Sequence, residues 1–354
     1  MSKSKYIAAP QDGQEILRIL ESSAAKGNIE LLYTRRPDAY ESYMKESGES
    51  RIFVSKDDER TIGTCAELIR EVYIGGEICN TAYICGLKKD ARYGGSVGFG
   101  AGFIRELWRE DIDFYYCSVV SDNKDAQKMF EKSRRIISMN PITEYTTYIL
   151  STNVKIKSQT HDLDFRQATE NDLKKLIDFL NKQGRKNDLF PVITSLKQFY
   201  GLTYKDFYIL SKDNRIVATA ALWNQTEYKQ YVVKQYRGIM KSARMANPIL
   251  SLLGYIKLPR ENTTLDFPLL SFFISEDGNQ EYYRIFLSEI KREIGKKYKM
   301  FVIGMPRNHF ASSIFNKLPS IHFDTKLYEI TFPWSKQNCK KINVENLTPE
   351  CALL

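Results

Sequence analysis

A ten-residue pattern occurs twice in the 354-residue chain, each time just after a hydrophobic segment. It reads N-x-x-A-x-x-Φ-F-x-K, where Φ is an apolar residue, and it begins at Asn123 and again at Asn308, 185 positions later. In each copy the Ala and the Phe are four residues apart, so they share one helix face and allow close packing on a sheet. The preceding segments, 114–120 and 300–304, are typical of buried strands. The pattern therefore predicts two copies of one strand–helix plan.

The beginnings of the two halves correspond as well. An extended segment at 6–9 precedes an amphipathic helix, and the segment 165–168 precedes another, with Thr169 placed to cap it and Gly184 to end it. A hairpin is then predicted in each half, over 61–87 with a turn at Gly75-Gly76, and over 207–223 with a turn at 212–214. Two unrelated units that share a common pattern would not explain these further matches. We therefore favour an internal duplication.

Length and composition are those of a soluble globular protein. The length favours about two domains, with 43% apolar and 27% charged residues. No run reaches the ~20 apolar residues of a membrane span, and no apolar segment of a secretory signal is visible at the N-terminus. The six cysteines form no CxxC pair, which is typical of reduced core thiols rather than of disulfides or zinc ligands. We expect a cytoplasmic protein without a metal site.

The excess of basic residues lies in the second half. Residues 1–157 contain 23 Lys and Arg and 23 Asp and Glu, whereas residues 158–354 contain 29 and 20, which accounts for the net charge of +9. The segment 229–260 has seven basic residues, interleaved tyrosines and no acidic residue. We expect a solvated helical insertion that covers the sheet. Alternatively, the segment presents a basic, aromatic face to an acidic acceptor, a membrane surface or a partner protein. No motif for sequence-specific nucleic-acid binding is present.

This order of elements resembles the GNAT acetyltransferase superfamily over most of residues 5–150 and, more weakly, over 163–333. The resemblance implies an α/β (α+β) fold of two tandem GNAT-like domains, each a mixed, mostly antiparallel twisted sheet flanked by helices. The expected domains are residues 1–157, which would bind acyl-CoA, and 158–334, with a basic insertion at 224–263. Residues 335–354 form a C-terminal tail.

In this superfamily a loop of pattern (Q/R)-x-x-G-x-(G/A) holds the pyrophosphate of acetyl-CoA, and the matching stretch here is 90–98. Small residues allow backbone N–H groups to approach phosphate oxygens, and the N-terminus of the following helix adds a partial positive charge. Gly98 fits the pattern, whereas Tyr93 and Ser96 depart from it. The acidic stretch 275–280 stands at the equivalent place in the second half, so we expect no CoA there. The expected cofactor-binding residues are Leu87, Lys89, Arg92, Tyr93, Gly94, Gly95, Ser96, Val97, Gly98, Asn123 and Phe130.

Acyl transfer to an amine requires a neutral amine and a proton for the departing thiolate. The tyrosine that the superfamily commonly uses as proton donor is replaced by Phe130, and by Phe315 in the second half. Glu67, Glu71 and Tyr116 are the candidate catalytic residues, although solvated strand positions or packing would also explain them. The three histidines form neither a Ser-His-Asp set nor a metal-ligand spacing.

The sequence thus predicts an N-acyltransferase that moves an acetyl group from acetyl-CoA directly to an amine of an unknown acceptor, which could be acidic. Two alternatives remain open. One is a non-catalytic, degenerate GNAT binding module, suggested by Tyr93, Ser96 and Phe130. The other is a transferase that uses a longer acyl-CoA or aminoacyl-tRNA. The sequence is compatible with an oligomer and does not define one.

Overall fold

The computed structural model describes residues 3–25, 27–47, 49–94, 106–124, 126–128, 137–158, 162–252, 254–335 and 341–354. In the first half the expected helix and hairpin are present, and Gly75 and Gly76 adopt the positive φ angles of the tight turn. The main elements are β1 (Lys3–Ile7), α1 (Gly13–Glu21), β2 (Ile29–Thr34), α2 (Ala39–Met44), β3 (Glu49–Asp57), β4 (Arg60–Ile74), β5 (Glu77–Lys89), β6 (Phe114–Val120) and β7 (Ser138–Ser151).

The second half repeats this order, as the sequence predicts. Thr169 and Asp172 form a capping box before α5, and Asp213 and Asn214 make the second hairpin turn. The elements are β8 (Asp164–Gln167), α5 (Leu173–Gly184), β9 (Phe207–Lys212), β10 (Arg215–Trp223), β11 (Gln230–Tyr236), α6 (Gly238–Met245), α7 (Asn247–Leu252), β12 (Thr263–Thr264), β13 (Leu269–Ser275), α8 (Gln280–Gly295), β14 (Met300–Pro306), α9 (Ser312–Phe315) and β15 (Ser320–Thr331). The helix expected after Asn308 is short and begins only at Ser312, and the Asn308 side chain donates to the carbonyl of Val344.

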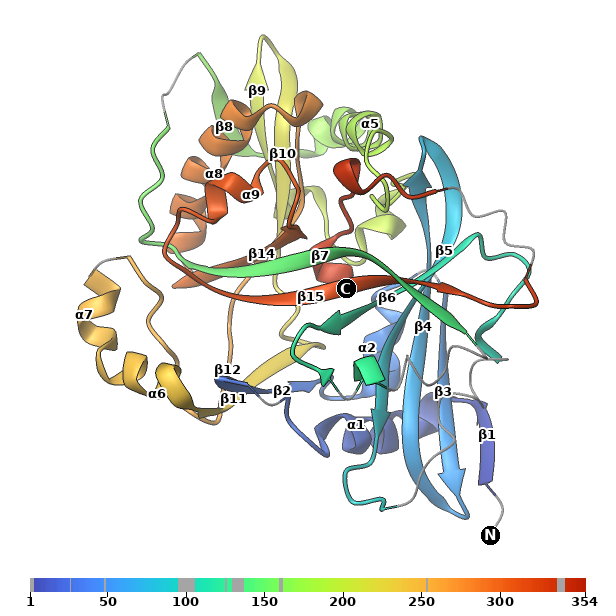
Figure 1. The fold of residues 1–354 in the computed structure, drawn as a ribbon. Helices are drawn as coiled ribbons and strands as arrows, with labels where there is room; N and C mark the ends of the chain where they lie inside the picture. Colours follow the sequence, from blue (N-terminus) through green and yellow to red (C-terminus); the bar gives the residue numbers. More distant parts are fainter. Residues whose placement is uncertain are drawn as a thin grey trace.

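The strands of both halves form one continuous sheet of 12 strands, in the order β1-β3-β4-β5-β6-β15-β7-β14-β13-β10-β9-β8. Two strands are exchanged. β7 of the first half pairs antiparallel with β14 of the second, while β15 of the second half pairs antiparallel with β6 of the first. β7 and β15 also pair with each other along most of their lengths, across the middle of the molecule (Figure 1).

The basic insertion covers only part of this sheet, since Val233 and Ile256 are buried in the same cluster as Leu269. Its strand β11 pairs with β2 of the first half and with β12, which gives a separate three-stranded sheet. The helices α6 and α7 project from that sheet, away from the rest of the molecule (Figure 1). The insertion therefore joins the two halves at β2 and β11 and leaves its helices exposed.

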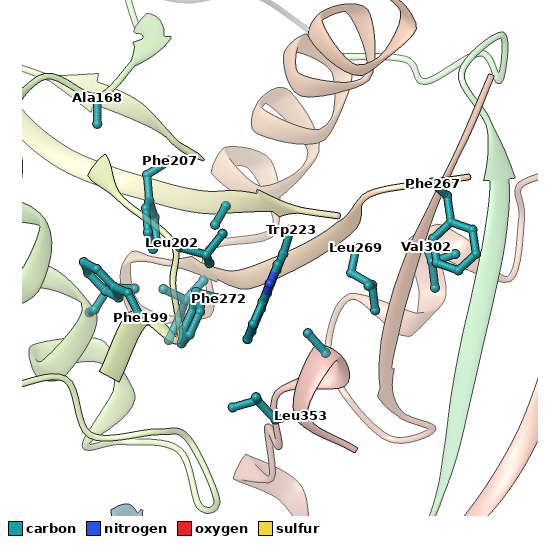
Figure 2. Close-up of a cluster of buried hydrophobic side chains, with 14 of the residues drawn as sticks. Ala168, Phe199, Leu202, Phe207, Trp223, Phe267, Leu269, Phe272, Val302 and Leu353 are labelled. Atoms are coloured by element: carbon teal, nitrogen blue, oxygen red, sulfur yellow. The ribbon is translucent and has the colours of Figure 1, made fainter. Parts of the chain in front are cut away.

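Buried side chains fill both faces of the long sheet. In the first half one face packs under α1 and α2, and in the second half α5 and α8 cover opposite faces. Figure 2 shows the aromatic cluster below β10 and β13, which includes Phe207, Trp223 and Phe272. No helix among the described residues is long and apolar enough to cross a membrane.

Candidate active site

In each half, two neighbouring parallel strands of the sheet stop pairing and separate, and we call each such place an opening. The parallel pair β5–β6 ends at Ile84 and Cys117, although β5 continues to Lys89. The parallel pair β13–β14 meets only at Leu269 and Val302, which lie 185 positions after Ile84 and Cys117. Both pairs therefore separate at the same point of the repeated plan. Beyond such a point, backbone N–H and C=O groups lack a neighbouring strand on that side and are available to another partner.

A bulge lies just beyond each opening. In β5 the register to β4 shifts around Gly86, which has φ +60°, and in β13 the register to β10 shifts around Phe272, which has φ +52°. A bulge bends its strand and redirects the local backbone groups. Because a positive φ is unfavourable for a bulky residue, the one at Phe272 indicates that its surroundings hold the backbone there.

The C-terminal tail holds Phe272 in this conformation. The carboxylate of Glu350 accepts a hydrogen bond from the Phe272 N–H at 2.6 Å and a second one from the Ala352 N–H at 3.0 Å. The turn of 3-10 helix at Cys351–Leu353 packs on both β13 and β14, with the Cys351 sulfur against Gly304. Leu353 is buried beside Trp223 and Leu269 (Figure 2). The tail therefore fills the opening of the second half.

The opening of the first half does not receive this tail helix, and its bulge carries a glycine. Two features require a glycine at position 86: its φ is +60°, and a Cβ would overlap the hydroxyl group of Tyr43. The adjacent side chain of Leu87 is exposed. The first half thus keeps an opening with a closely approached backbone, where the second half has a filled one.

We expect Gly86→Ala to destabilise the protein by about 3 kcal/mol, because a left-handed φ costs an L-residue roughly 1–2 kcal/mol and overpacking adds a similar amount. Urea unfolding would measure the change. Gly27→Ala is the matched control, since a Cβ there meets only a carbonyl oxygen at 3.5 Å. A Gly86→Ala protein as stable as the control would contradict the close contact with Tyr43.

A buried group of charged side chains lies where the two halves and the tail meet. Glu46 binds Arg35 at 2.7 Å and Lys229 of the second half at 3.0 Å, and all three side chains are almost fully buried. Lys229 also donates to the carbonyl of Ala352, and Arg70 donates to the carbonyl of Leu353 at 3.0 Å and to that of Glu46. We call Arg35, Glu46, Arg70 and Lys229 the junction cluster.

The junction cluster has an excess of positive charge and unused polar atoms. It has three cations and one carboxylate, and Nη2 of the buried Arg70 makes no hydrogen bond. Burial alone would raise the pKa of Glu46, but the neighbouring Arg35 and Lys229 charges outweigh it and lower the pKa to about 2. Glu46 is therefore ionised at neutral pH, and the cluster remains charged inside the protein.

Next to the predicted phosphate loop, three arginines bind one buried carboxylate. The buried carboxylate of Asp90 binds Arg18 at 2.7 Å, Arg60 at 2.9 Å and Arg92 at 3.3 Å. Burial would raise the pKa of Asp90, but hydrogen bonds from Arg92, Arg18 and Arg60 hold it well below its usual range. Arg60 and Arg92 remain about half exposed or more, which leaves positive charge at the start of the loop.

The structure places several other predicted cofactor residues. Lys88, which lies between the predicted residues Leu87 and Lys89, points away from the loop, because its ammonium donates to carbonyls at the end of α1. Tyr93 donates to Asp57 at 2.6 Å, and Asn123 accepts from the Ala126 N–H at 3.1 Å as a helix cap. Lys89 and Gly94 lie at the end of β5 and just after it, and both are exposed. Gly95, Ser96, Val97, Gly98 and Phe130 lie outside the described residues.

The three predicted catalytic residues are not brought together. The Glu67 carboxylate is buried and bound by Arg51, and burial raises its pKa. Tyr116 faces the opposite side of the sheet, in the cluster of buried side chains that lies under α1 and α2. Glu71 is exposed on β4. Tyr116 interacts with Arg70 of the junction cluster: burial raises the pKa of Tyr116, and the Arg70 guanidinium opposes this.

Sequence reasoning missed the junction cluster and the tail. Arg35 and Lys229 are far apart in the chain, and both look like ordinary surface charges in the sequence. The available signal was Glu350, a carboxylate placed among the apolar residues Leu347, Ala352 and Leu353. A charged residue in such a stretch is rarely buried without a specific partner.

Comparison with solved structures identifies proteins of the same shape. The Saccharomyces cerevisiae N-myristoyltransferase with bound myristoyl-CoA matches with a TM-score of 0.60 and 9% identity, over 98% of this chain and 89% of that one. A GCN5-related N-acetyltransferase from Anabaena variabilis matches with a TM-score of 0.54 and 10% identity, over 93% and 72%. A probable N-acyltransferase from Enterococcus faecalis matches with a TM-score of 0.51 and 10% identity, over 94% and 73%.

No protein-family model matches the sequence, and no curated protein matches it either. The likeness to the solved structures therefore lies in the fold, and it extends over nearly the whole chain, including both halves and their connection. This chain therefore has the same fold as the N-myristoyltransferase and the GCN5-related N-acetyltransferase that it matches, with its two halves joined in one sheet.

Proposed function

We propose that the protein is an N-acyltransferase that binds an acyl-CoA at the opening between β5 and β6 and transfers its acyl group directly to an amine. The observation that carries this proposal is the difference between the two equivalent openings. The tail fills the one in the second half, through Glu350 and Leu353, whereas the first half has Gly86 at its bulge and arginines at the start of its glycine-rich loop. Only the first half combines an open edge with positive charge.

In the proposed reaction, the amine nitrogen attacks the thioester carbon, the C–S bond breaks, the departing thiolate takes a proton from Tyr116, and the proton lost by the amine returns to the tyrosinate. Backbone N–H groups of β5 beyond Ile84 would hold the thioester arm, since they have no β6 partner there. Tyr116 is the proposed proton donor to the thiolate. Burial raises the pKa of its hydroxyl, which keeps it protonated at neutral pH, and Arg70 beside it would stabilise the tyrosinate that forms.

Acetyl-CoA is the donor that the sequence resemblance implies. A longer acyl-CoA is the second candidate, because the yeast enzyme with bound myristoyl-CoA matches the fold of this chain over 98% of its length. The acceptor remains an amine of unknown identity.

We expect calorimetry to detect binding of at least one donor in a series from acetyl-CoA to myristoyl-CoA. Gly98→Val should weaken that binding by at least about tenfold, because a side chain would keep the backbone from the pyrophosphate. Gly27→Val, at an exposed position with free space, is the matched control. The donor that binds most tightly would decide between acetyl and longer acyl groups.

Turnover with a panel of small amines and amino-terminal peptides would then test catalysis. If no acyl-CoA binds, or if Gly98→Val and the control bind equally, the proposed site is wrong. Binding without turnover on any amine would instead favour the non-catalytic alternative.

A further inference from the structure

The exposed helices of the basic insertion carry an unusual combination of side chains. Ile239 and Met245 on α6 and Ile249 on α7 are 74%, 75% and 68% exposed, and they are the three most exposed large hydrophobic residues in the described part of the chain. We call the segment 237–260 the arm. Large apolar side chains on a projecting segment cost solubility and indicate a contact surface.

The arm nevertheless has a defined conformation, which hydrogen bonds from its side chains hold. The buried side chain of Asn247 donates to the Ile256 carbonyl at 2.9 Å and accepts from the Leu258 N–H at 2.9 Å, which ties the start of α7 to the segment that follows it. At the base, Tyr236 donates to the Pro259 carbonyl at 2.9 Å. These contacts hold the three apolar side chains outward in a defined arrangement.

The charges of the arm have one sign. Between Lys229 and Arg260 there is no acidic residue. Arg237 and Arg244 are paired with Glu30 and Glu261, which flank the arm in the structure. Among the described residues, the exposed side chains of Lys241, Lys257 and Arg260 form no ion pair. The arm therefore offers uncompensated positive charge next to exposed apolar side chains.

We propose that the arm docks on an anionic lipid bilayer. Its helices have 8 and 6 residues, so each is only ~10 Å long, too short to form the ~800 Å² face that a stable protein–protein interface needs on each side. A projecting tip with separate apolar side chains fits a planar, deformable surface. Ile239, Met245 and Ile249 enter the interface between headgroups and acyl chains, and the cations bind the headgroup phosphates and carboxylates. The half-exposed Tyr255 has the amphipathic character of residues at that depth.

Sedimentation with sucrose-loaded vesicles tests this proposal on the full chain. We expect the protein to bind phosphatidylcholine–phosphatidylserine vesicles at least about tenfold more strongly than pure phosphatidylcholine vesicles, with the difference decreasing as salt is added. The triple variant Ile239→Ser, Met245→Ser, Ile249→Ser should lose at least about tenfold in partitioning. Its matched control replaces three exposed residues elsewhere, Ile7, Ile78 and Leu196, by serine and should bind as the parent does.

A charge variant separates the electrostatic contribution to binding from that of the apolar side chains. Replacing Lys241, Lys257 and Arg260 by glutamine should reduce binding to anionic vesicles and leave the weak binding to neutral ones unchanged. The same changes at Lys197, Lys212 and Arg215, which are exposed on the opposite part of the second half, should have little effect. Thermal unfolding would confirm that all variants are folded.

Three results would overturn the proposal. The first is that the parent protein does not bind anionic vesicles. The second is that the arm variant and its serine control lose binding equally. The third is that the protein binds soluble poly-glutamate but not vesicles, which would indicate an acidic protein as partner. None of these results depends on acyl transfer, so the proposal stands or falls separately from the enzymatic one.

Discussion

Glu46→Gln should destabilise the protein by about 3 kcal/mol. The change removes the only carboxylate of the junction cluster and leaves the buried cations Arg35 and Lys229 facing each other without compensation. Breaking one partner of a buried ion pair typically costs about 3–5 kcal/mol, because the remaining charge has lost its water and its partner.

The same pair should make stability depend on pH in the acid range. The pKa of Glu46 is about 2 in the folded protein, below its ordinary value of 4.5 in the unfolded chain, so the unfolded state binds a proton first as the pH falls. This contribution is complete above pH 4.5 and disappears as the pH falls to about 2. Urea unfolding at several pH values would measure it. In Glu46→Gln, the loss of stability that protonation of Glu46 causes at acid pH should be absent.

Glu41→Gln is the control, since Glu41 lies exposed on the same helix, α2. It should change stability by no more than a few tenths of a kcal/mol. Equal stability of the two variants would contradict a buried, charged junction cluster.

Removal of residues 350–354 is expected to cost at least about 4 kcal/mol. Four buried or half-buried donors lose their acceptors, namely Arg70, Gln225, Lys229 and the N–H of Phe272. Each unsatisfied donor costs about 1–3 kcal/mol where water cannot replace the partner, and the buried side chain of Leu353 adds roughly 2 kcal/mol. Since a typical domain is stable by only 5–15 kcal/mol, the shortened chain would be near its limit.

Urea unfolding of the shortened chain would measure this loss. Adding a synthetic peptide of residues 344–354 should restore part of the lost stability, because the binding site for the tail between β13 and β14 remains. Glu345→Gln, at an exposed position of the same tail, should leave stability unchanged. A shortened protein as stable as the full chain would show that the tail does not occupy the opening of the second half.

The sequence allowed prediction of those elements whose signal is local. The helices at 13–21 and 173–184 follow from their apolar periodicity and end signals, and the hairpin at 60–89 follows from alternating strands around Gly75-Gly76. The repeated pattern indicated the duplication. In the structure the two openings are also 185 positions apart, as the two copies of the pattern are. The assignment of donor binding to the first half remains a prediction, as do the roles of Glu67, Glu71 and Tyr116.

The rest depends on contacts between distant residues. The strands 138–151 and 320–331 are similar in hydrophobic pattern, so nothing in either shows which half of the sheet it joins. Lys229 meets Glu46 only because β11 pairs with β2. The basic segment was expected to cover the sheet, but that same strand pairing turns its helices outward.

The exchange of β7 and β15 affects how the protein must be made. A ribosome that has produced the first 157 residues has released a sheet whose strand β6 has no neighbour on one side, because that neighbour is β15, residues 320–331. Until β15 has been synthesised, this exposed edge could pair with any other extended chain. We therefore expect the first half to complete its folding only after β15 has left the ribosome, with a need for chaperones during synthesis that two separable domains would not have.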